Sequence, residues 1–270
     1  MRERVVLKWG GGLITEKDQM KTVRTDVLDQ LTDQLHACLE QGFEVILVHG
    51  AGSFGHLKAK QYKLADGLLP NVEFQPLSQR DAIEEVRNDM LELNQHVMDA
   101  LTRRDISAVA IPPHQWAKGT GPDFEGDLTF FEQAPRGIVM VTFGDVVECD
   151  HPRQFGILSG DDIVKRLAAE IEGVNRLVFA MGGVEGVLAS PPQDGEPMPE
   201  LLSTLSSNDV FVGEHQSDMD VTGGIGLKVK RGFEALDSGI EVWLVSGEHG
   251  LRVQEACMGL PVTGTQLLKS

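Results

Sequence analysis

The sequence contains little cysteine, and its three cysteines lie far apart. Cys38, Cys149 and Cys257 form no C-x-x-C pair. An odd number of scattered thiols provides neither a disulfide framework nor a metal signature. We therefore expect reduced cysteines, packed as small core or near-surface residues, and a cytoplasmic protein.

Long apolar runs are also missing. No stretch approaches the roughly 18 apolar residues of a transmembrane helix. Residues 1–18 contain two arginines, but Lys8 and three glycines interrupt their apolar stretch, which is too short for a signal peptide. The sequence therefore predicts neither a membrane span nor a secretory leader.

Positive charge is scarce. Twenty-four Lys and Arg stand against 41 Asp and Glu, and the net charge is −17. Most of the surface would repel nucleic acid and anionic membranes, so we expect neither as a partner. An anionic small-molecule substrate would need a local cluster of positive charge, which makes the placement of a few lysines informative.

Six short runs rich in Val and Ile are predicted to be strands, at residues 5–9, 44–49, 107–112, 137–147, 176–181 and 241–246. Their apolarity is continuous rather than alternating, which indicates a mostly parallel sheet covered on both faces. Helical patterns lie between them, at residues 25–42, 78–103, 162–173 and 225–239. Strands alternate with helices, so the fold class is α/β, and the length of 270 residues suits one structural unit.

Three segments do not follow this alternation. Residues 57–77 and 113–135 are mixed in polarity. We expect loops or a hairpin there, over the carboxyl edge of the sheet, where ligands bind in open α/β folds. Residues 191–200 are expected to form a solvated loop.

The glycines of HGAGSFGH, residues 49–56, have the G-x-G-x-x-G spacing of a dinucleotide-binding turn at Gly50, Gly52 and Gly55. That motif requires a second strand that ends in an acidic residue about 20 residues later. No apolar strand follows before Gly67. An NAD-binding oxidoreductase is therefore disfavoured.

Three further glycine-rich turns lie at strand ends or helix starts, at residues 10–12, 159–162 and 220–224. Any one of them would suit an ordinary turn. Such turns also present backbone N–H groups to anions, so four turns at one sheet edge would form a polyphosphate site. Lysines lie close to two of the turns: Lys8 and Lys17 flank the first, and Lys228 follows Gly224 by one helical turn.

Six motifs carry a family resemblance. They are LKWGGGLITEK (7–17), VHGAGSFGH (48–56), FGDVV (143–147), ILSGDD (157–162), DVTGG (220–224) with Lys228, and VTGTQL (262–267). In this order the chain resembles isopentenyl phosphate kinase, of the amino acid kinase superfamily, from residue 5 to the C-terminus. The resemblance implies a single domain over residues 1–270 with the amino acid kinase fold, a three-layer αβα sandwich with a mostly parallel central sheet. It further implies a homodimer and transfer of the γ-phosphate of ATP to isopentenyl phosphate.

The resemblance also implies catalytic residues. Lys8 and Lys228 would contact the ATP phosphates, and Lys17 would stabilise charge on the transferring group. His56 would donate to the acceptor phosphate. A lysine inside an apolar strand needs an anionic partner, and Asp161 would orient the lysines.

Binding residues follow from the same motifs. The nucleotide phosphates would lie against Gly10, Gly11, Gly52 and Gly223, and the acceptor would meet Ala51, His56 and Gly160. Mg²⁺ would accompany ATP, with no metal ligand assigned to the protein. The acceptor would bind in an N-terminal lobe, about residues 1–155, and the nucleotide in a C-terminal lobe, about residues 156–270.

Three segments depart from the family. The first loop is GGG where the family usually has GGS, and MGGVEGVL (181–188) replaces a more acidic segment near the nucleoside. RDAIEEVRND (80–89) replaces a largely apolar helix that lines the prenyl pocket. The family function requires its charged face to be solvated, with Ile83, Val86, Met90 and Leu91 facing inward.

A charged face turned toward the acceptor would instead favour a more polar substrate. The related fosfomycin kinases, which phosphorylate a small phosphonate, are the enzyme alternative. A non-catalytic nucleotide-binding protein of the same fold is the other, although the presence of all three lysines, His56 and Asp161 argues against it.

Overall fold

The computed structural model describes residues 3–16, 19–192, 195, 197–209 and 224–270. Its main sheet has the strand order β10-β12-β11-β9-β1-β2-β6-β3. Neighbouring strands run parallel, except that β12 runs antiparallel to β11. The strands are β1 (Arg4–Trp9), β2 (Glu44–His49), β3 (Ala108–Ala110), β6 (Val139–Phe143), β9 (Val174–Met181), β10 (Thr204–Ser206), β11 (Glu241–Ser246) and β12 (Thr265–Leu268).

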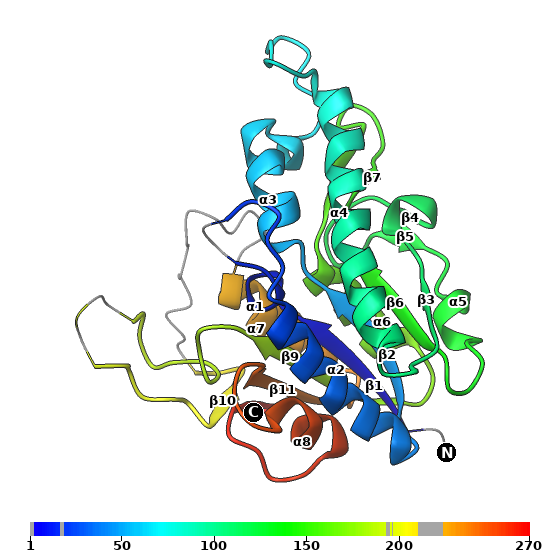
Figure 1. Cartoon of the computed structure of the whole chain (residues 1–270). Coiled ribbons are helices and arrows are strands. Elements are labelled where there is room, and N and C mark those ends of the chain that lie inside the picture. Colours follow the sequence, from blue (N-terminus) through cyan, green and yellow to red (C-terminus); the bar gives the residue numbers. More distant parts are fainter. Residues whose placement is uncertain (1–2, 17–18, 193–194, 196, 210–223) are drawn as a thin grey trace.

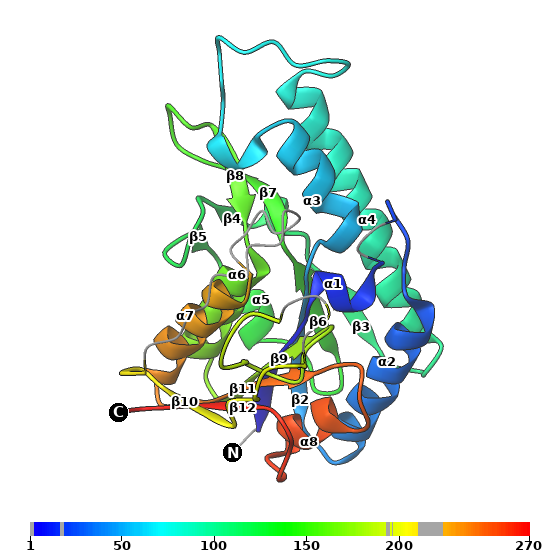
Figure 2. The same cartoon turned by 90° about the vertical axis from the view of Figure 1, so that its left-hand side faces the viewer.

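Helices cover both faces of this sheet, as Figure 2 shows with the helices on either side of the strands. On one side lie α1 (Gly11–Ile14), α2 (Thr25–Glu40), α4 (Gln79–Thr102) and α8 (Arg252–Met258). On the other lie α5 (Thr129–Glu132), α6 (Gly160–Glu170) and α7 (Gly224–Leu236). The expected three-layer αβα sandwich with a mostly parallel sheet is confirmed.

Two hydrophobic cores explain the continuous apolarity of the strands. Along β1, Val5, Leu7 and Trp9 pack into the core beneath α2 and α4, whereas Val6 packs into the core beneath α6 and α7. Successive side chains of a strand point to opposite faces. Lys8 therefore points to the same face as Val6, toward α6.

A second sheet lies beyond the carboxyl end of the main sheet, in the upper part of Figure 1. Its order is β5-β4-β7-β8, with β4 (Ala117–Lys118), β5 (Glu125–Gly126), β7 (Asp145–Glu148) and β8 (Phe155–Leu158). The prediction of one strand over residues 137–147 is wrong, because the run divides at Gly144 into β6 and β7. The chain leaves the main sheet there, and β7 pairs antiparallel with β8.

The long helices agree with their predicted ranges to within a few residues. Ser78 caps α4 by accepting from the Asp81 backbone N–H at 3.2 Å, and α2 stops just before Gly42, whose φ is +87°. The α6 helix begins at Gly160, before its predicted start, because the Ser159 hydroxyl accepts from the Asp161 N–H.

The prediction of loops or a hairpin over residues 57–77 is wrong in part. The glycine turn leads directly into α3 (Gly52–Gln61), which is followed by the short η1 (Leu64–Asp66). Glycines within α3 obscured its helical periodicity. The next element is α4 rather than a strand, so the βαβ unit of a dinucleotide fold does not form here.

The second mixed segment, 113–135, contains η2 (Pro113–Gln115), the antiparallel pair β4 and β5, and α5. The expected hairpin is therefore present, together with short helices. Residues 191–200 contain no helix or strand among those that the structure describes. Within the described ranges, no helix has the length and apolarity needed to cross a bilayer.

Candidate active site

A cavity of about 590 Å³ opens at the carboxyl ends of β1, β2 and β9. Backbone from the turns at 10–12, 50–52 and 159–161 lines it, together with Gly224 at the start of α7. These turns precede α1, α3 and α6, so the N-termini of three helices converge on one space. The arrangement suits a ligand with several phosphate groups.

The first two glycine turns pack directly against each other. A Cβ atom at Gly11 would overlap the backbone nitrogen of Gly52, and one at Gly50 would lie 2.5 Å from the nitrogen of Gly11. Gly52 has a φ of +50°, and a side chain there would strike Thr15 Oγ1. That hydroxyl accepts from the N–H of Ser53 at 3.0 Å. Only glycine allows the two backbones this approach.

Two lysines meet one carboxylate at the floor of the cavity. Lys8 Nζ, from β1, lies 2.7 Å from Asp161 Oδ1, and Lys228 Nζ, from α7, lies 3.5 Å from Oδ2. Asp161 and Lys8 are 2% and 5% exposed. Burial alone would raise the pKa of Asp161, but Lys228 and Lys8 outweigh it and lower that pKa. Asp161 is therefore an anionic partner shared by two lysines, and the cluster has a formal excess of one positive charge toward an anion.

His56 enters the cavity from α3. Directly before it, Gly55 packs against α4, since a Cβ there would lie 3.1 Å from Met90 Sδ. His56 and Ala51 both line the cavity, close to the N-terminus of their helix. A donor on this wall and the N-terminus of α6 at Gly160 therefore border the same space.

Nearly all the predicted site residues come together in this cavity. Its lining includes Lys8, Gly10, Gly11, Ala51, Gly52, His56, Gly160, Asp161 and Lys228. Lys17 and Gly223 lie outside the described residues. The roles assigned to these residues remain predictions.

One part of the cavity wall is apolar, and the sequence did not indicate most of it. It is formed by Ala59, Val86, Met90, Val146 and Ile157. These residues come from α3, α4 and the second sheet, so no single sequence pattern contains them. The wall suits a hydrocarbon chain attached to the acceptor phosphate.

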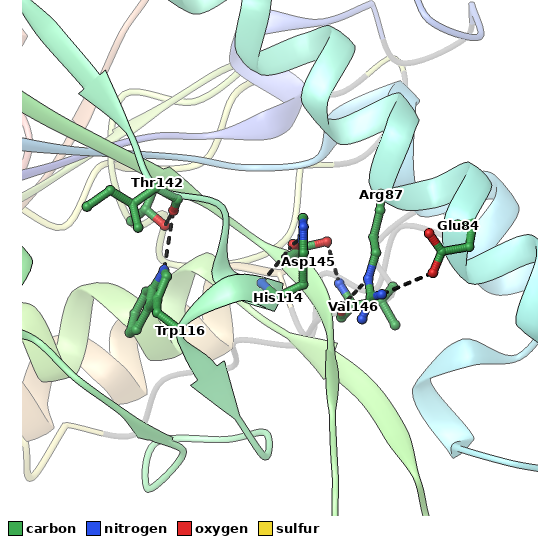
Figure 3. Close-up of polar contacts among 8 residues, drawn as sticks. Glu84, Arg87, His114, Trp116, Thr142, Asp145 and Val146 are labelled. Atoms are coloured by element: carbon green, nitrogen blue, oxygen red, sulfur yellow. Dashed lines mark hydrogen bonds and ion pairs between the residues drawn. The ribbon is translucent and has the colours of Figure 1, made fainter.

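The charged residues of 80–89 mostly face away from this wall. Asp81 and Glu84 are exposed. Arg87 donates to the Val146 carbonyl at 3.0 Å and lies 3.1 Å from Glu84 (Figure 3). The inward orientation predicted for Ile83, Val86 and Met90 agrees with their burial, but Leu91 is 38% exposed and that part of the prediction is wrong.

Asp145 also borders the cavity and was not singled out in the sequence. Its Oδ2 accepts from His114 Nδ1 at 2.7 Å and from the His114 backbone N–H at 3.2 Å, as Figure 3 shows for the side chains. Its Oδ1 accepts from the Val146 N–H at 2.7 Å. The sequence offered one signal for Asp145, which is an acidic residue inside an apolar run. A carboxylate buried there requires hydrogen-bond donors such as these.

Comparisons with known proteins agree with this site. The model of the amino acid kinase family matches residues 3–246. Isopentenyl phosphate kinase of Haloferax volcanii is 32% identical over 234 residues, which cover 84% of this chain and 86% of that protein. The Thermoplasma acidophilum enzyme of the same name is 30% identical over 255 residues, covering 92% and 94%.

Among solved structures, a product complex of Thermoplasma acidophilum isopentenyl phosphate kinase superimposes with a TM-score of 0.76 and 26% identity. The match covers 98% of this chain and 99% of that one. The chain belongs to the amino acid kinase family and, by these relatives, to the isopentenyl phosphate kinases within it.

Proposed function

We propose that the protein transfers the γ-phosphate of ATP to isopentenyl phosphate and releases ADP and isopentenyl diphosphate. The observation that carries this proposal is one cavity that combines the buried Lys8–Asp161 pair and the partly buried Lys228 with an apolar wall. The isopentenyl phosphate kinases of Thermoplasma acidophilum and Haloferax volcanii, 30% and 32% identical to this chain, support the same reaction.

The reaction needs charge neutralisation more than a strong base. A phosphate monoester has a second pKa of about 6, so its oxygen is already anionic at neutral pH. That oxygen forms a bond to the γ-phosphorus, and the bond from the γ-phosphorus to the bridging oxygen of ADP breaks. The main barrier is the approach of two polyanions, which fixed positive charges and N–H donors lower.

Lys8 and Lys228 are assigned to the phosphates of ATP. Asp161 holds both ammonium groups at fixed positions, which avoids reorganisation during the reaction. Lys17 is assigned to charge on the transferring group by its place in the motif LKWGGGLITEK, which resembles that of the family. Gly10, Gly11 and Gly52 would line the nucleotide phosphates, with Gly223 assigned to the same side. The N–H of Gly10 itself donates to the Ala180 carbonyl at 2.9 Å, so this glycine would offer close approach rather than a hydrogen bond.

The acceptor phosphate is assigned to the opposite wall. His56 would donate to it, beside Ala51 and the backbone of Gly160. The prenyl chain would lie against Val86 and Met90 of α4. A fosfomycin kinase is disfavoured, because that small polar acceptor would leave the apolar wall unfilled.

Mg²⁺ fits this site as an ion held by the nucleotide. Among the described residues, no three His, Cys, Asp or Glu side chains gather as metal ligands, and both carboxylate oxygens of Asp161 face lysines. Mg²⁺ in kinases is bound largely by substrate phosphates and water. The ion would supply further neutralisation of phosphate charge.

The proposal includes two lobes, with the acceptor over about residues 1–155 and the nucleotide over 156–270. It also includes a cytoplasmic homodimer. Light scattering after size exclusion would measure twice the 29.5 kDa chain mass for a dimer, and the chain mass itself would exclude it.

The decisive experiment measures Mg²⁺-dependent ADP release with isopentenyl phosphate beside dimethylallyl phosphate, geranyl phosphate and fosfomycin. Preference for isopentenyl phosphate is expected. Turnover of fosfomycin alone would contradict the assigned acceptor while retaining phosphoryl transfer. Absence of turnover with any acceptor, despite ATP binding, would favour a non-catalytic nucleotide-binding protein.

A further inference from the structure

A buried carboxylate on α4 joins two lysines from different segments. Asp89 is only 5% exposed. Its Oδ1 lies 2.5 Å from Lys21 Nζ, and its Oδ2 lies 2.7 Å from Lys58 Nζ. The same lysines have outer partners, Glu92 at 2.8 Å and Glu85 at 2.7 Å, whose side chains are about half exposed. Asp89 alone connects both lysines and is shielded from water.

Both lysines belong to segments that border the acceptor side of the cavity. Lys58 lies on α3, two residues after His56. Lys21 follows the first glycine turn, and its backbone N–H approaches the carbonyl of Ser53 at 3.5 Å. Ser53 is also anchored by Thr15. Asp89 therefore connects α4 both to the helix that carries His56 and to the chain segment beside the start of that helix.

The connection lies beside a tight contact between α3 and α4. Met90 follows Asp89, and its sulfur would lie 3.1 Å from a Cβ at Gly55. His56 comes directly after Gly55. Any displacement of α3 from α4 at this point would therefore move His56 within the cavity.

The electrostatics favour a persistent link. Asp89 and then Glu92 raise the pKa of Lys21. Burial lowers the pKa of Lys58, but Asp89 and Glu85 outweigh this and raise it. Both lysines stay charged at neutral pH. Without Asp89, Lys21 and Lys58 would keep only Glu92 and Glu85, whose side chains are about half exposed, and exposed pairs contribute little.

We propose that Asp89 is a positioning residue for the acceptor phosphate: its carboxylate holds α3 and Lys21 against α4 and thereby fixes His56. This inference rests on the proposed function for the identity of the acceptor. It also gives the charged segment 80–89 a use other than contact with the substrate.

The first test measures amide hydrogen exchange without any ligand in Asp89→Asn, Glu85→Gln and Glu92→Gln. Asp89→Asn is expected to speed exchange over residues 52–61 by about tenfold or more, because the buried carboxylate that joins α4 to α3 loses its charge. Glu85→Gln and Glu92→Gln are expected to stay within about twofold of the unmodified protein, as exposed pairs do. Equal protection of 52–61 in all three variants would overturn the inference.

The second test separates positioning from general stability. With isopentenyl phosphate, Asp89→Asn is expected to raise the acceptor KM by about tenfold or more and to leave the ATP KM within about twofold. Asp89→Glu should recover part of the acceptor affinity. Equal changes in both KM values, or a lowered melting temperature with unchanged KM values, would show a merely structural role and overturn the inference.

Two controls keep the outcomes distinct. If Asp89→Asn does not fold, Lys58→Met removes the α3 half of the link and is expected to raise the acceptor KM in the same way. If the unmodified protein does not turn over isopentenyl phosphate, the proposed function fails. The exchange experiment still decides the role of Asp89, because it uses no substrate.

Discussion

Lys8 and Asp161 form an ion pair of 2.7 Å in which 6% and 3% of the two side chains remain exposed. One comes from the central strand of the sheet and the other from the first turn of α6. Burial of either charge alone would cost free energy. The Lys8 ammonium group can therefore lie at the floor of the cavity only because Asp161 is paired with it.

Replacement of Asp161 by Asn should therefore destabilise the protein as well as inactivate it. We expect the free energy of unfolding in urea to fall by about 3–5 kcal/mol at pH 7, the cost of leaving a buried charge without its partner. Turnover should fall because both lysines lose their fixed positions. Glu170→Gln on the same helix is the control, because Glu170 pairs with Arg166 and its side chain is 44% exposed. This variant should lose less than about 1 kcal/mol of unfolding free energy. Similar losses in the two variants would contradict the role of Asp161.

Replacement of His56 by Ala should separate acceptor chemistry from nucleotide binding. We expect kcat with isopentenyl phosphate to fall by about 10²–10³, as for the loss of one donor to developing charge. The Kd of ATP, measured by calorimetry, should stay unchanged because His56 is assigned to the opposite wall. His36→Ala, on the surface of α2, is the matched control. Unchanged acceptor kinetics would remove His56 from its assigned role.

The sequence was sufficient for the central elements of the fold. The strands at 44–49 and 241–246 match β2 and β11 exactly as predicted, because buried parallel strands have an unmistakable run of Val, Ile and Leu. The strands β10 and β12 were missed. They are short, and their segments TLS and TQLL contain too few apolar residues to stand out. Pairing with neighbouring strands, rather than local composition, defines them.

The site also has a part that the sequence predicted and a part that it did not. Glycine turns and lysines repeat at recognisable spacings, so their convergence could be predicted. The apolar wall was predicted only at Val86 and Met90 of α4. Ala59 and Ile157 could not be predicted, because they come from α3 and β8, whose arrangement depends on the second sheet. Asp89 was hidden for a related reason. In a charged segment nothing local distinguishes the one carboxylate that becomes buried.

Glycine at position 52 should be required for steric as well as conformational reasons. Gly52 has a φ of +50°, and an added Cβ would strike Thr15 Oγ1 and approach the carbonyl oxygen of Gly11 at 2.6 Å. Gly137 has a φ of +78° with open space around it. Gly137→Ala should therefore lose only about 1–2 kcal/mol of unfolding free energy, the cost of a left-handed conformation. Gly52→Ala should lose clearly more and should weaken ATP binding. Equal losses of unfolding free energy in the two variants would contradict the steric requirement, because the two glycine turns could then move apart to accept a side chain.

His49 should make stability depend on pH in the mildly acidic range. It ends β2, is fully buried and stacks on Phe143 at a centroid distance of 4.9 Å. Burial, opposed by hydrogen bonds to the Gly50 carbonyl and Asn94, lowers its pKa from 6.5 to about 4. The folded protein therefore keeps this ring neutral at pH values where the unfolded chain binds a proton.

The sign of the effect follows from this difference. Well above pH 6.5 neither state is protonated at His49, and this residue contributes no pH dependence to stability. As the pH falls from 6.5 to about 4, the unfolded chain takes up a proton that the folded protein does not, so the unfolding free energy should decline by on the order of 3 kcal/mol. Urea unfolding at several pH values in this window, compared between the unmodified protein and His49→Gln, measures the slope. The variant should show a shallower decline, and identical slopes would mean that His49 is accessible to protons in the folded state.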